Sequence, residues 1–272
     1  MGEPILEVFN LLVARSGKLV LKDISLTVSE GEFVGVVGPN GSGKSTLMLA
    51  ILGILKPSRG SIEIYGNPPL SRKLHRRIGW VSQAAANLPK DVRLTVRELV
   101  RLGTVNSGNM FDLRFIIPSG LWDAVDIFDI LKGSRLPRER VDNAISMVGL
   151  EDVEDIDISR LSGGQRQRAV IARALATEAD FILLDEPLVG IDRDSRNSLL
   201  KLLDRLCHEE GKTILMVSHD LAAIRKTAHR MIFLEESIRF DGPTSSFPDL
   251  EELADLRGIK DPHEGDQMPV EN

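Results

Sequence analysis

Apolar positions recur along this chain of 272 residues with two different periods, one typical of strands and the other of helices. Continuous apolar runs at 32–38, 181–184 and 213–217 predict strands of a parallel sheet that is buried on both faces. Further strands, which we expect to form a separate antiparallel layer, are predicted at 5–13, 19–28 and 61–65.

Apolar residues at helical spacing predict a helix over 44–55 and another over 193–209, which Gly211 ends. Helix patterns therefore alternate with the buried strand runs. This alternation predicts an α/β fold with a mostly parallel sheet, beside which the antiparallel layer lies.

The stretch between Gln83 and Leu161 is dominated by helical patterns. Thr95 and Glu98 form a capping box ahead of an apolar run, which marks a helix start. We therefore predict a helical subdomain, inserted at about 84–160 in a domain of residues 1–243. Its other helices are predicted at 122–131 and 137–148.

A glycine-rich segment joins the strand at 32–38 to the helix at 44–55. It matches the pattern of a phosphate-binding loop, because its glycines allow successive N–H groups to point inward at an anion. Lys44 would reach the β- and γ-phosphates and the Ser45 hydroxyl would bind Mg²⁺. The alternative is a turn that merely connects two elements, and the loop alone does not distinguish a kinase, a GTPase and a motor. Its residues are Gly38, Pro39, Asn40, Gly41, Ser42, Gly43, Lys44, Ser45 and Thr46.

Two adjacent carboxylates follow the apolar run at 181–184, at the end of a strand where ligands gather in open α/β sheets. Asp185 would hold Mg²⁺, and Glu186 would polarise the attacking water as a general base. The alternative is a simple turn, since Pro187 prevents further strand pairing.

Ser162, with Gln165 three residues later, forms a second capping box. The free N–H groups at this helix start favour a phosphate, although an ordinary helix cap is the alternative. The segment Leu161-Ser162-Gly163-Gly164-Gln165 resembles the signature of ATP-binding cassette (ABC) proteins.

Other ABC motifs follow in the expected order along 5–242. Gln83 resembles the Q-loop glutamine, Gly190-Ile191-Asp192 resembles the D-loop, and His219 resembles the switch histidine. The resemblance implies an ABC nucleotide-binding domain: a P-loop NTPase core with an antiparallel β layer and an inserted helical subdomain.

The resemblance further implies that two copies close around two ATP molecules with Mg²⁺. Ser162, Gly163, Gly164 and Gln165 of one copy would cover the γ-phosphate held by the other, and Gln83 and Asp192 would also line the site. His219 would hold Glu186 and the water in line. The implied catalytic residues are Lys44, Gln83, Glu186 and His219, and the implied Mg²⁺ ligands are Ser45, Gln83 and Asp185.

Composition limits the remaining possibilities. No apolar run approaches the roughly 20 residues that span a bilayer, and no signal peptide is recognisable. A membrane role would therefore act through a separate permease, and the resemblance implies a peripheral position at the cytoplasmic face of the plasma (inner) membrane. The lone Cys207 predicts a packing role in a reducing compartment. A net charge of -6 argues against a nucleic-acid partner. The polar tail at 244–272 is predicted to be partly disordered.

Two features depart from the ABC pattern. Many cassettes stack an aromatic ring on adenine where this chain has Arg15 or Ser16; the Arg15 guanidinium could stack on the base or simply lie at the surface. The segment at 108–129 is unusually apolar. It could dock on a permease, but we favour packing within its own subdomain.

The segments at 94–103 and 187–192 resemble those of importer ATPases for zinc, manganese or iron, with siderophore and cobalamin importers next. The resemblance implies a homodimer that powers transport of a metal ion or metal chelate, together with a permease and an extracytoplasmic substrate-binding protein. The alternative is a soluble ABC ATPase of macromolecular assembly with no membrane partner. A P-loop kinase is the third possibility, because a kinase would not need the signature-like segment at 161–165.

Overall fold

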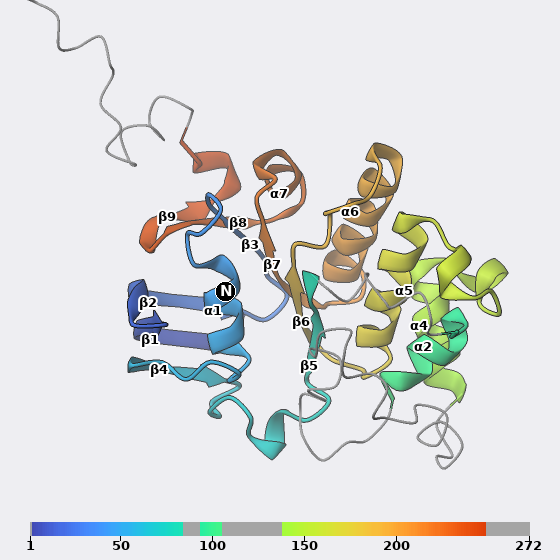
Figure 1. Ribbon diagram of the computed structural model, residues 1–272, viewed down its shortest axis with the longest axis horizontal. Helices are drawn as coiled ribbons and strands as arrows, with labels where there is room; N and C mark the ends of the chain where they lie inside the picture. The colour runs from blue at the N-terminus through green and yellow to red at the C-terminus, as the bar shows by residue number, and fades with distance from the viewer. Residues whose placement is uncertain (1, 84–92, 105–137, 249–272) are drawn as a thin grey trace, which may run out of the picture.

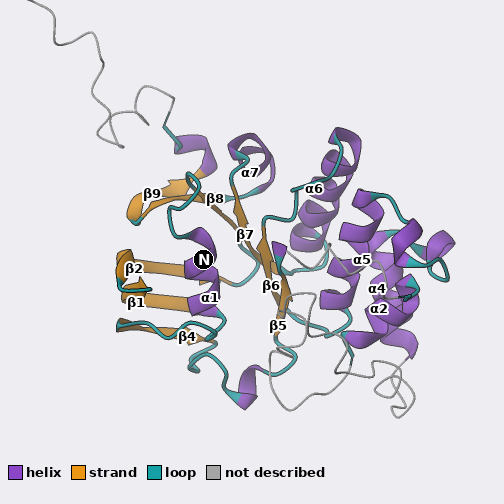
Figure 2. Cartoon of the chain, viewed as in Figure 1, coloured by secondary structure: helices purple, strands orange, loops and turns teal. Residues whose placement is uncertain are grey.

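The computed structural model describes residues 2–83, 93–104 and 138–248. Across these ranges the layers follow one another in a fixed order: a small antiparallel sheet, the helix α1, a larger sheet and a group of helices (Figure 1). Figure 2 shows the same separation, with α2, α4, α5 and α6 gathered at one side of the larger sheet and α1 at the other. The predicted α/β class is confirmed.

The smaller sheet is the predicted antiparallel layer, with strand order β2-β1-β4. The strand predicted at 61–65 begins two residues late and ends one residue late. It stops at Ile64 because Tyr65 has a left-handed φ of 49° and begins a turn closed by Ile64 and Asn67. The strands are β1 (Pro4–Arg15), β2 (Lys18–Ser29) and β4 (Arg59–Ile64).

The larger sheet has six strands in the order β5-β6-β7-β3-β8-β9. The first five run parallel, and β9 pairs antiparallel with β8 at one edge. The three predicted apolar runs became β3, β6 and β7, which are neighbours in the sheet. The strands are β3 (Phe33–Val37), β5 (Ile78–Val81), β6 (Phe181–Asp185), β7 (Thr213–Ser218), β8 (Arg230–Glu235) and β9 (Ser237–Pro243).

Side chains of β6 alternate between two hydrophobic cores. Phe181 and Leu183 face the core shared with α1 and the antiparallel sheet, whereas Ile182 and Leu184 face the core shared with the other helices. All four are fully buried. A strand covered on both faces needs apolar residues at every position, which explains the continuous run in the sequence. Each such side chain contributes roughly 1.5–3 kcal/mol through its burial.

The helices agree in position with most of the predicted ones. The helix predicted at 193–209 is α6, and Gly211 beyond it has a left-handed φ of 65°. The capping box of Thr95 and Glu98 is present at the start of α2. The helices are α1 (Lys44–Ile51), α2 (Val96–Leu102), α4 (Arg138–Val148), α5 (Gly163–Leu175), α6 (Arg193–His208) and α7 (Leu221–Thr227), with single 3₁₀ turns η1 (Arg72–Leu74), η5 (Glu151–Val153), η6 (Ile158–Arg160) and η7 (Thr244–Ser246).

The prediction of a helix over 44–55 is wrong at its C-terminal end, because α1 stops at Ile51. The N–H of Ile54 donates to the carbonyl of Leu49 at 3.0 Å, and Gly53 takes a left-handed φ of 71°. This arrangement is a Schellman motif, which satisfies the last carbonyls of a helix and requires a residue that tolerates positive φ. Glycine tolerates it at no steric cost, so the helix ends there.

The helices α2 and α4 pack against α5 in one core, where Leu99, Ile145 and Val170 are fully buried. They make up the described part of the segment predicted to be a helical subdomain. The predicted helix at 122–131, the apolar segment at 108–129 and the tail beyond 248 lie outside the described residues. The domain boundaries stay predictions.

In the described part of the chain, no helix is long and apolar enough to cross a membrane.

Cys207 lies in the last turn of α6 and is buried. Burial, reinforced by the carboxylates of Asp204 and Glu32, raises the pKa of its thiol to about 11. The thiolate is the reactive form of cysteine, so we expect the native protein to react very slowly with iodoacetamide at pH 7.5. Mass spectrometry measures the modified fraction. Protein unfolded in guanidinium is the control and should react at the rate of a free thiol; rapid labelling of the native protein would contradict the packing role.

Candidate functional site

The glycine-rich loop leaves β3 and enters α1, as predicted. Gly41 and Gly43 have left-handed φ values of 82° and 102°, and Gly43 is the N-cap of α1. A Cβ on Gly43 would lie 2.5 Å from Leu21 Cδ2, and one on Gly38 would lie 2.1 Å from the Leu234 carbonyl oxygen. The loop therefore needs glycine at these positions both for its backbone angles and for its close packing against β2 and β8.

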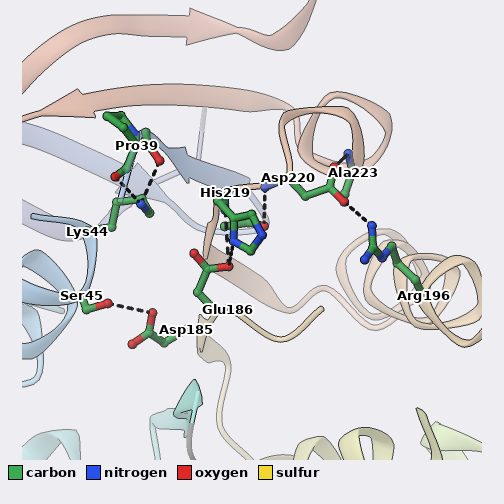
Figure 3. A network of polar contacts seen from close by, with 11 residues as sticks. Pro39, Lys44, Ser45, Asp185, Glu186, Arg196, His219, Asp220 and Ala223 are labelled. Atoms are coloured by element: carbon green, nitrogen blue, oxygen red, sulfur yellow. Dashed lines mark hydrogen bonds and ion pairs between the residues drawn. The ribbon is translucent and has the colours of Figure 1, made fainter. Parts of the chain in front are cut away.

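Lys44, the first residue of α1, is buried beneath this loop. Its ammonium donates to the carbonyls of Gly38 (2.8 Å) and Pro39 (2.9 Å), as Figure 3 shows. Burial lowers the pKa of this lysine, and the carboxylates of Glu186 and Asp185 oppose the shift. A desolvated cation thus lies at the start of a helix whose own N–H groups favour an anion.

Ser45 and Asp185 meet, although 140 positions separate them in the sequence. The Ser45 hydroxyl donates to Asp185 Oδ1 at 3.3 Å (Figure 3). Asp185 ends β6 and is almost buried; burial raises the pKa of its carboxyl, while the bond from Ser45 and the charge of Lys44 lower it. A hydroxyl and a carboxylate are the hard oxygen ligands that Mg²⁺ prefers.

The loop also holds a polar atom without a protein partner. Ser42 Oγ is buried, and in the described part of the chain nothing hydrogen-bonds to it. A buried hydroxyl in this position costs free energy unless a ligand pairs with it. The loop therefore fits a polyphosphate, and the oxygen pair of Ser45 and Asp185 beside it fits the accompanying Mg²⁺.

Glu186 and His219 form the second half of the site. Glu186 Oε2 accepts from the His219 ring Nδ1 at 2.8 Å (Figure 3). Because a carboxylate only accepts hydrogen bonds, Nδ1 is the ring nitrogen that donates in this contact. The Glu186 side chain is only 9% exposed, whereas that of His219 is 58% exposed. Glu186 also has a left-handed φ of 52°, which is strained for a residue other than glycine.

The predicted capping box of Ser162 and Gln165 is present at the start of α5. Ser162 Oγ accepts from the Gln165 N–H at 3.2 Å, and Gln165 Oε1 accepts from the Ser162 N–H at 3.0 Å. α5 packs in the core on one face of the larger sheet, whereas α1 packs in the core on the other face. The turn at Ser162 and the phosphate loop therefore begin two helices, α5 and α1, that lie on opposite faces of the larger sheet.

Asp192 is the N-cap of α6. Its Oδ1 accepts from the N–H groups of Asp194 (3.1 Å) and Ser195 (2.9 Å), which lowers the pKa of this carboxyl. A Cβ on Gly164 would lie only 2.4 Å from Ser195 Cβ, so the start of α5 rests directly on the first turn of α6. A Cβ on Gly163 would lie 3.2 Å from the Gly190 carbonyl oxygen, so the segments at 161–165 and 190–192 also pack together.

The two remaining predicted residues, Gln83 and Arg15, are both exposed. Gln83 is exposed and follows β5 at the same sheet edge as Asp185, since Val81 is paired with Leu184 in register. Arg15 is exposed at the end of β1 and is paired with Lys18. The neighbour of Gly43 on this side is β2, through Val20 and Leu21, rather than Arg15.

Sequence reasoning missed Arg196 and Asp220. Asp220 follows His219 and accepts from Arg196 Nη1 at 2.8 Å (Figure 3). It is also the N-cap of α7. An aspartate directly before a helical pattern is a recognisable start signal, but no sequence pattern pairs it with an arginine on another helix.

A second group of metal-binding residue types lies at the amino ends of β3 and β8, away from the phosphate loop. Cys207, His208 and His229 place ligand atoms within 4.8 Å of one another there. The Phe33 N–H donates to His229 Nδ1 at 3.0 Å, so the proton of the neutral His229 ring is on Nε2. That Nε2 points at His208 Nε2, 2.9 Å away. The geometry is a hydrogen bond between neutral rings and does not fit a cation.

The fold and this site define a phosphate-loop nucleotide-binding protein with a parallel sheet. Its family follows from a direct match: the chain belongs to the ABC transporter family, whose model, described as "ABC transporter", matches residues 21–189.

Individual relatives match over nearly the full chain. The zinc uptake system ATP-binding protein ZurA of Listeria innocua is 34% identical, covering 94% of this chain and 95% of the relative. The manganese transport system ATP-binding protein MntB of Bacillus subtilis is 35% identical, covering 93% and 92%. A dimeric post-hydrolysis state of the ATP-binding cassette MJ0796, bound to ADP and Pi, superposes with a TM-score of 0.66 at 29% identity, covering 89% of this chain and 100% of that one.

Replacing Lys44 by alanine should weaken ATP binding on the order of 10- to 100-fold, because a charge-assisted contact to the phosphates is lost. Titration with a fluorescent ATP analogue measures the affinity. Lys22→Ala is the matched control, since Lys22 is an exposed lysine paired with Glu236. An unchanged affinity in the Lys44 variant would contradict the phosphate cradle.

Proposed function

We propose that this chain is the ATP-hydrolysing subunit of a metal-uptake ABC transporter. The observation that carries the proposal is the contact of Glu186 with His219 beside the loop of Lys44 and Ser45. A general base, its orienting partner and a phosphate cradle are thereby combined in one site. The family match supports ATP as the nucleotide, and the relatives' names support metal uptake.

Each residue has a role in hydrolysis. The loop amides and Lys44 bind the phosphates, and Ser45, Asp185 and Gln83 hold Mg²⁺. The metal ion, when bound, supplies charge neutralisation at the phosphate oxygens. Glu186 accepts a proton from the attacking water as its oxygen bonds to the γ-phosphorus, and the bond to the β-phosphate breaks to leave ADP and phosphate. His219 Nδ1 holds Glu186 in place for this step.

The reaction needs a second copy of the chain. Ser162, Gly163, Gly164 and Gln165 start a helix that packs on the other face of the sheet from α1, so they do not serve the loop of their own copy. In a homodimer they cover the γ-phosphate held by the partner, with Asp192 near the shared interface. The dimeric arrangement of MJ0796 supports this assembly.

The chain acts at the cytoplasmic face of the membrane as a peripheral subunit. Residues 1–243 form the ATPase domain, with the helical subdomain at about 84–160 as the element that meets an integral membrane permease. An extracytoplasmic binding protein delivers the metal.

Relatives named for zinc uptake and manganese transport support a divalent metal cargo and do not favour the assembly-factor alternative. Arg15, exposed at the end of β1, is the candidate for stacking on adenine, and a plain surface arginine is the alternative.

Glu186→Gln should bind ATP normally and hydrolyse it about 10²- to 10⁴-fold more slowly, because the base is lost. The nucleotide then persists, and the variant should elute as a dimer in ATP during gel filtration. The double variant Glu186→Gln with Ser162→Arg should bind ATP but stay monomeric, since the bulky cation blocks the partner's phosphate site.

Two outcomes would contradict this composite site. Rapid ATP turnover by the Glu186 variant would remove this residue as the base. An ATP-dependent dimer that tolerates the Ser162 substitution would place the interface elsewhere.

The transport role is tested by purifying the tagged chain from gently solubilised membranes of its native cell. We expect a protein with many membrane spans to copurify. The complex, reconstituted in vesicles with ATP, should accumulate Zn²⁺ or Mn²⁺, and the Glu186→Gln complex is the control. Recovery of soluble proteins or ribosomes alone, with the chain absent from membranes, would overturn the transport role in favour of an assembly ATPase.

A further inference from the structure

We propose that Arg196 is a positioning residue for ATP hydrolysis, which holds His219 against Glu186 through its ion pair with Asp220. The proposal rests on the hydrolytic function proposed above. Arg196 is on α6 and Asp220 immediately precedes α7, so the pair joins two helices that the sequence separates by 24 positions.

Both carboxylate oxygens of Asp220 have a defined partner. Oδ2 accepts from Arg196 Nη1 at 2.8 Å, and Oδ1 accepts from the Ala223 N–H at 3.0 Å, which caps α7 (Figure 3). The Asp220 N–H donates to Ser218 Oγ at 3.0 Å, and Ser218 is fully buried at the end of β7. The backbone is therefore fixed on both sides of His219.

His219 itself depends on this fixed backbone. Its side chain is 58% exposed, so packing does little to orient the ring. Its Nδ1 lies 2.8 Å from Glu186, and its backbone N–H also points to this carboxylate at 3.4 Å. A rotation of the turn that carries His219 would lengthen both contacts, and a shift of about 1 Å in a catalytic array lowers rates on the order of 100-fold.

Arg196, at the other end of the ion pair, lies beside the start of α5. Asp192 caps α6 at the N–H groups of Asp194 and Ser195, and Gly164 packs against Ser195 without room for a Cβ. Arg196 is the next residue along the helix. Its side chain therefore connects the start of α5, which covers the partner's nucleotide, to the turn that carries His219.

Stability alone does not explain this pair. The Arg196 side chain is 42% exposed and that of Asp220 is 20% exposed, and an ion pair with one solvated partner adds little to folding. Its Nε is buried, and in the described ranges no group hydrogen-bonds to it. The hydrogen bond of Arg196 to Asp220 is therefore made by the end of its guanidinium group. This contact fits a role in positioning the turn of His219 and Asp220.

The test compares Arg196→Ala, Arg196→Lys and Asp220→Asn in full-length homodimer. We expect kcat of the alanine variant to fall on the order of 10- to 100-fold, while KM for ATP changes little, since Arg196 does not touch the phosphate loop. The observed contact uses one nitrogen, so lysine should restore much of kcat. The double variant Arg196→Ala with Asp220→Asn should have a kcat no lower than that of the slower single variant, because the two substitutions remove the same ion pair.

Arg205→Ala is the matched control, because Arg205 is on the same helix but donates to the Met147 carbonyl on another side. Its kcat should stay near wild type. Histidine ring resonances in NMR spectra give a readout without turnover: those of His219 should shift in Arg196→Ala and not in Arg205→Ala.

Unmoved His219 resonances in Arg196→Ala would overturn the proposal, as would an equal kcat loss in Arg205→Ala or additive losses in the double variant. Failure of the proposed function is a distinct result: the wild-type protein would then not hydrolyse ATP, while the NMR comparison would still decide whether Arg196 positions His219.

Discussion

The site depends on one constraint, the parallel pairing of three neighbouring strands in a common register. β7 lies between β6 and β3, with Asp185 paired to Val217 and Val37 paired to Ser218. All three strands end at the same edge, so the phosphate loop, the two acidic residues and His219 leave the sheet side by side. Hydrophobic burial on both faces of these strands holds the register, because a one-residue slip would exchange the two cores.

Much of this was predictable from the sequence. Continuous apolar runs predicted β3, β6 and β7 because burial on both faces leaves no polar position, and Ser162 and Gln165 predicted a helix start because capping is local. The end of α1 at Ile51, ahead of the left-handed Gly53, was missed, since Leu55 keeps the helical period although the backbone has already turned. The pair of Arg196 and Asp220 was missed for a different reason: it joins residues whose proximity exists only after α6 and α7 have packed on the sheet.

The turn at Ser162 has two structural tasks. Its side chains pair the N–H groups of Ser162 and Gln165 within the chain, so the shape of the turn is fixed before any partner arrives. Gly163 and Gly164 lack side chains because the D-loop and α6 press against them from behind. Close packing at the back leaves the front of the turn free to present backbone N–H groups, which suits recognition of a phosphate by main chain rather than by charge.

The left-handed backbone of Glu186 has a consequence for how this protein changes over time. Glycine or asparagine would occupy that conformation more cheaply than glutamate. Folding stability alone would therefore favour replacement of this residue, and its proposed role in turnover opposes that replacement. In a lineage that no longer needs hydrolysis, replacement of Glu186 by glycine or asparagine should increase the stability of the fold while removing its chemistry.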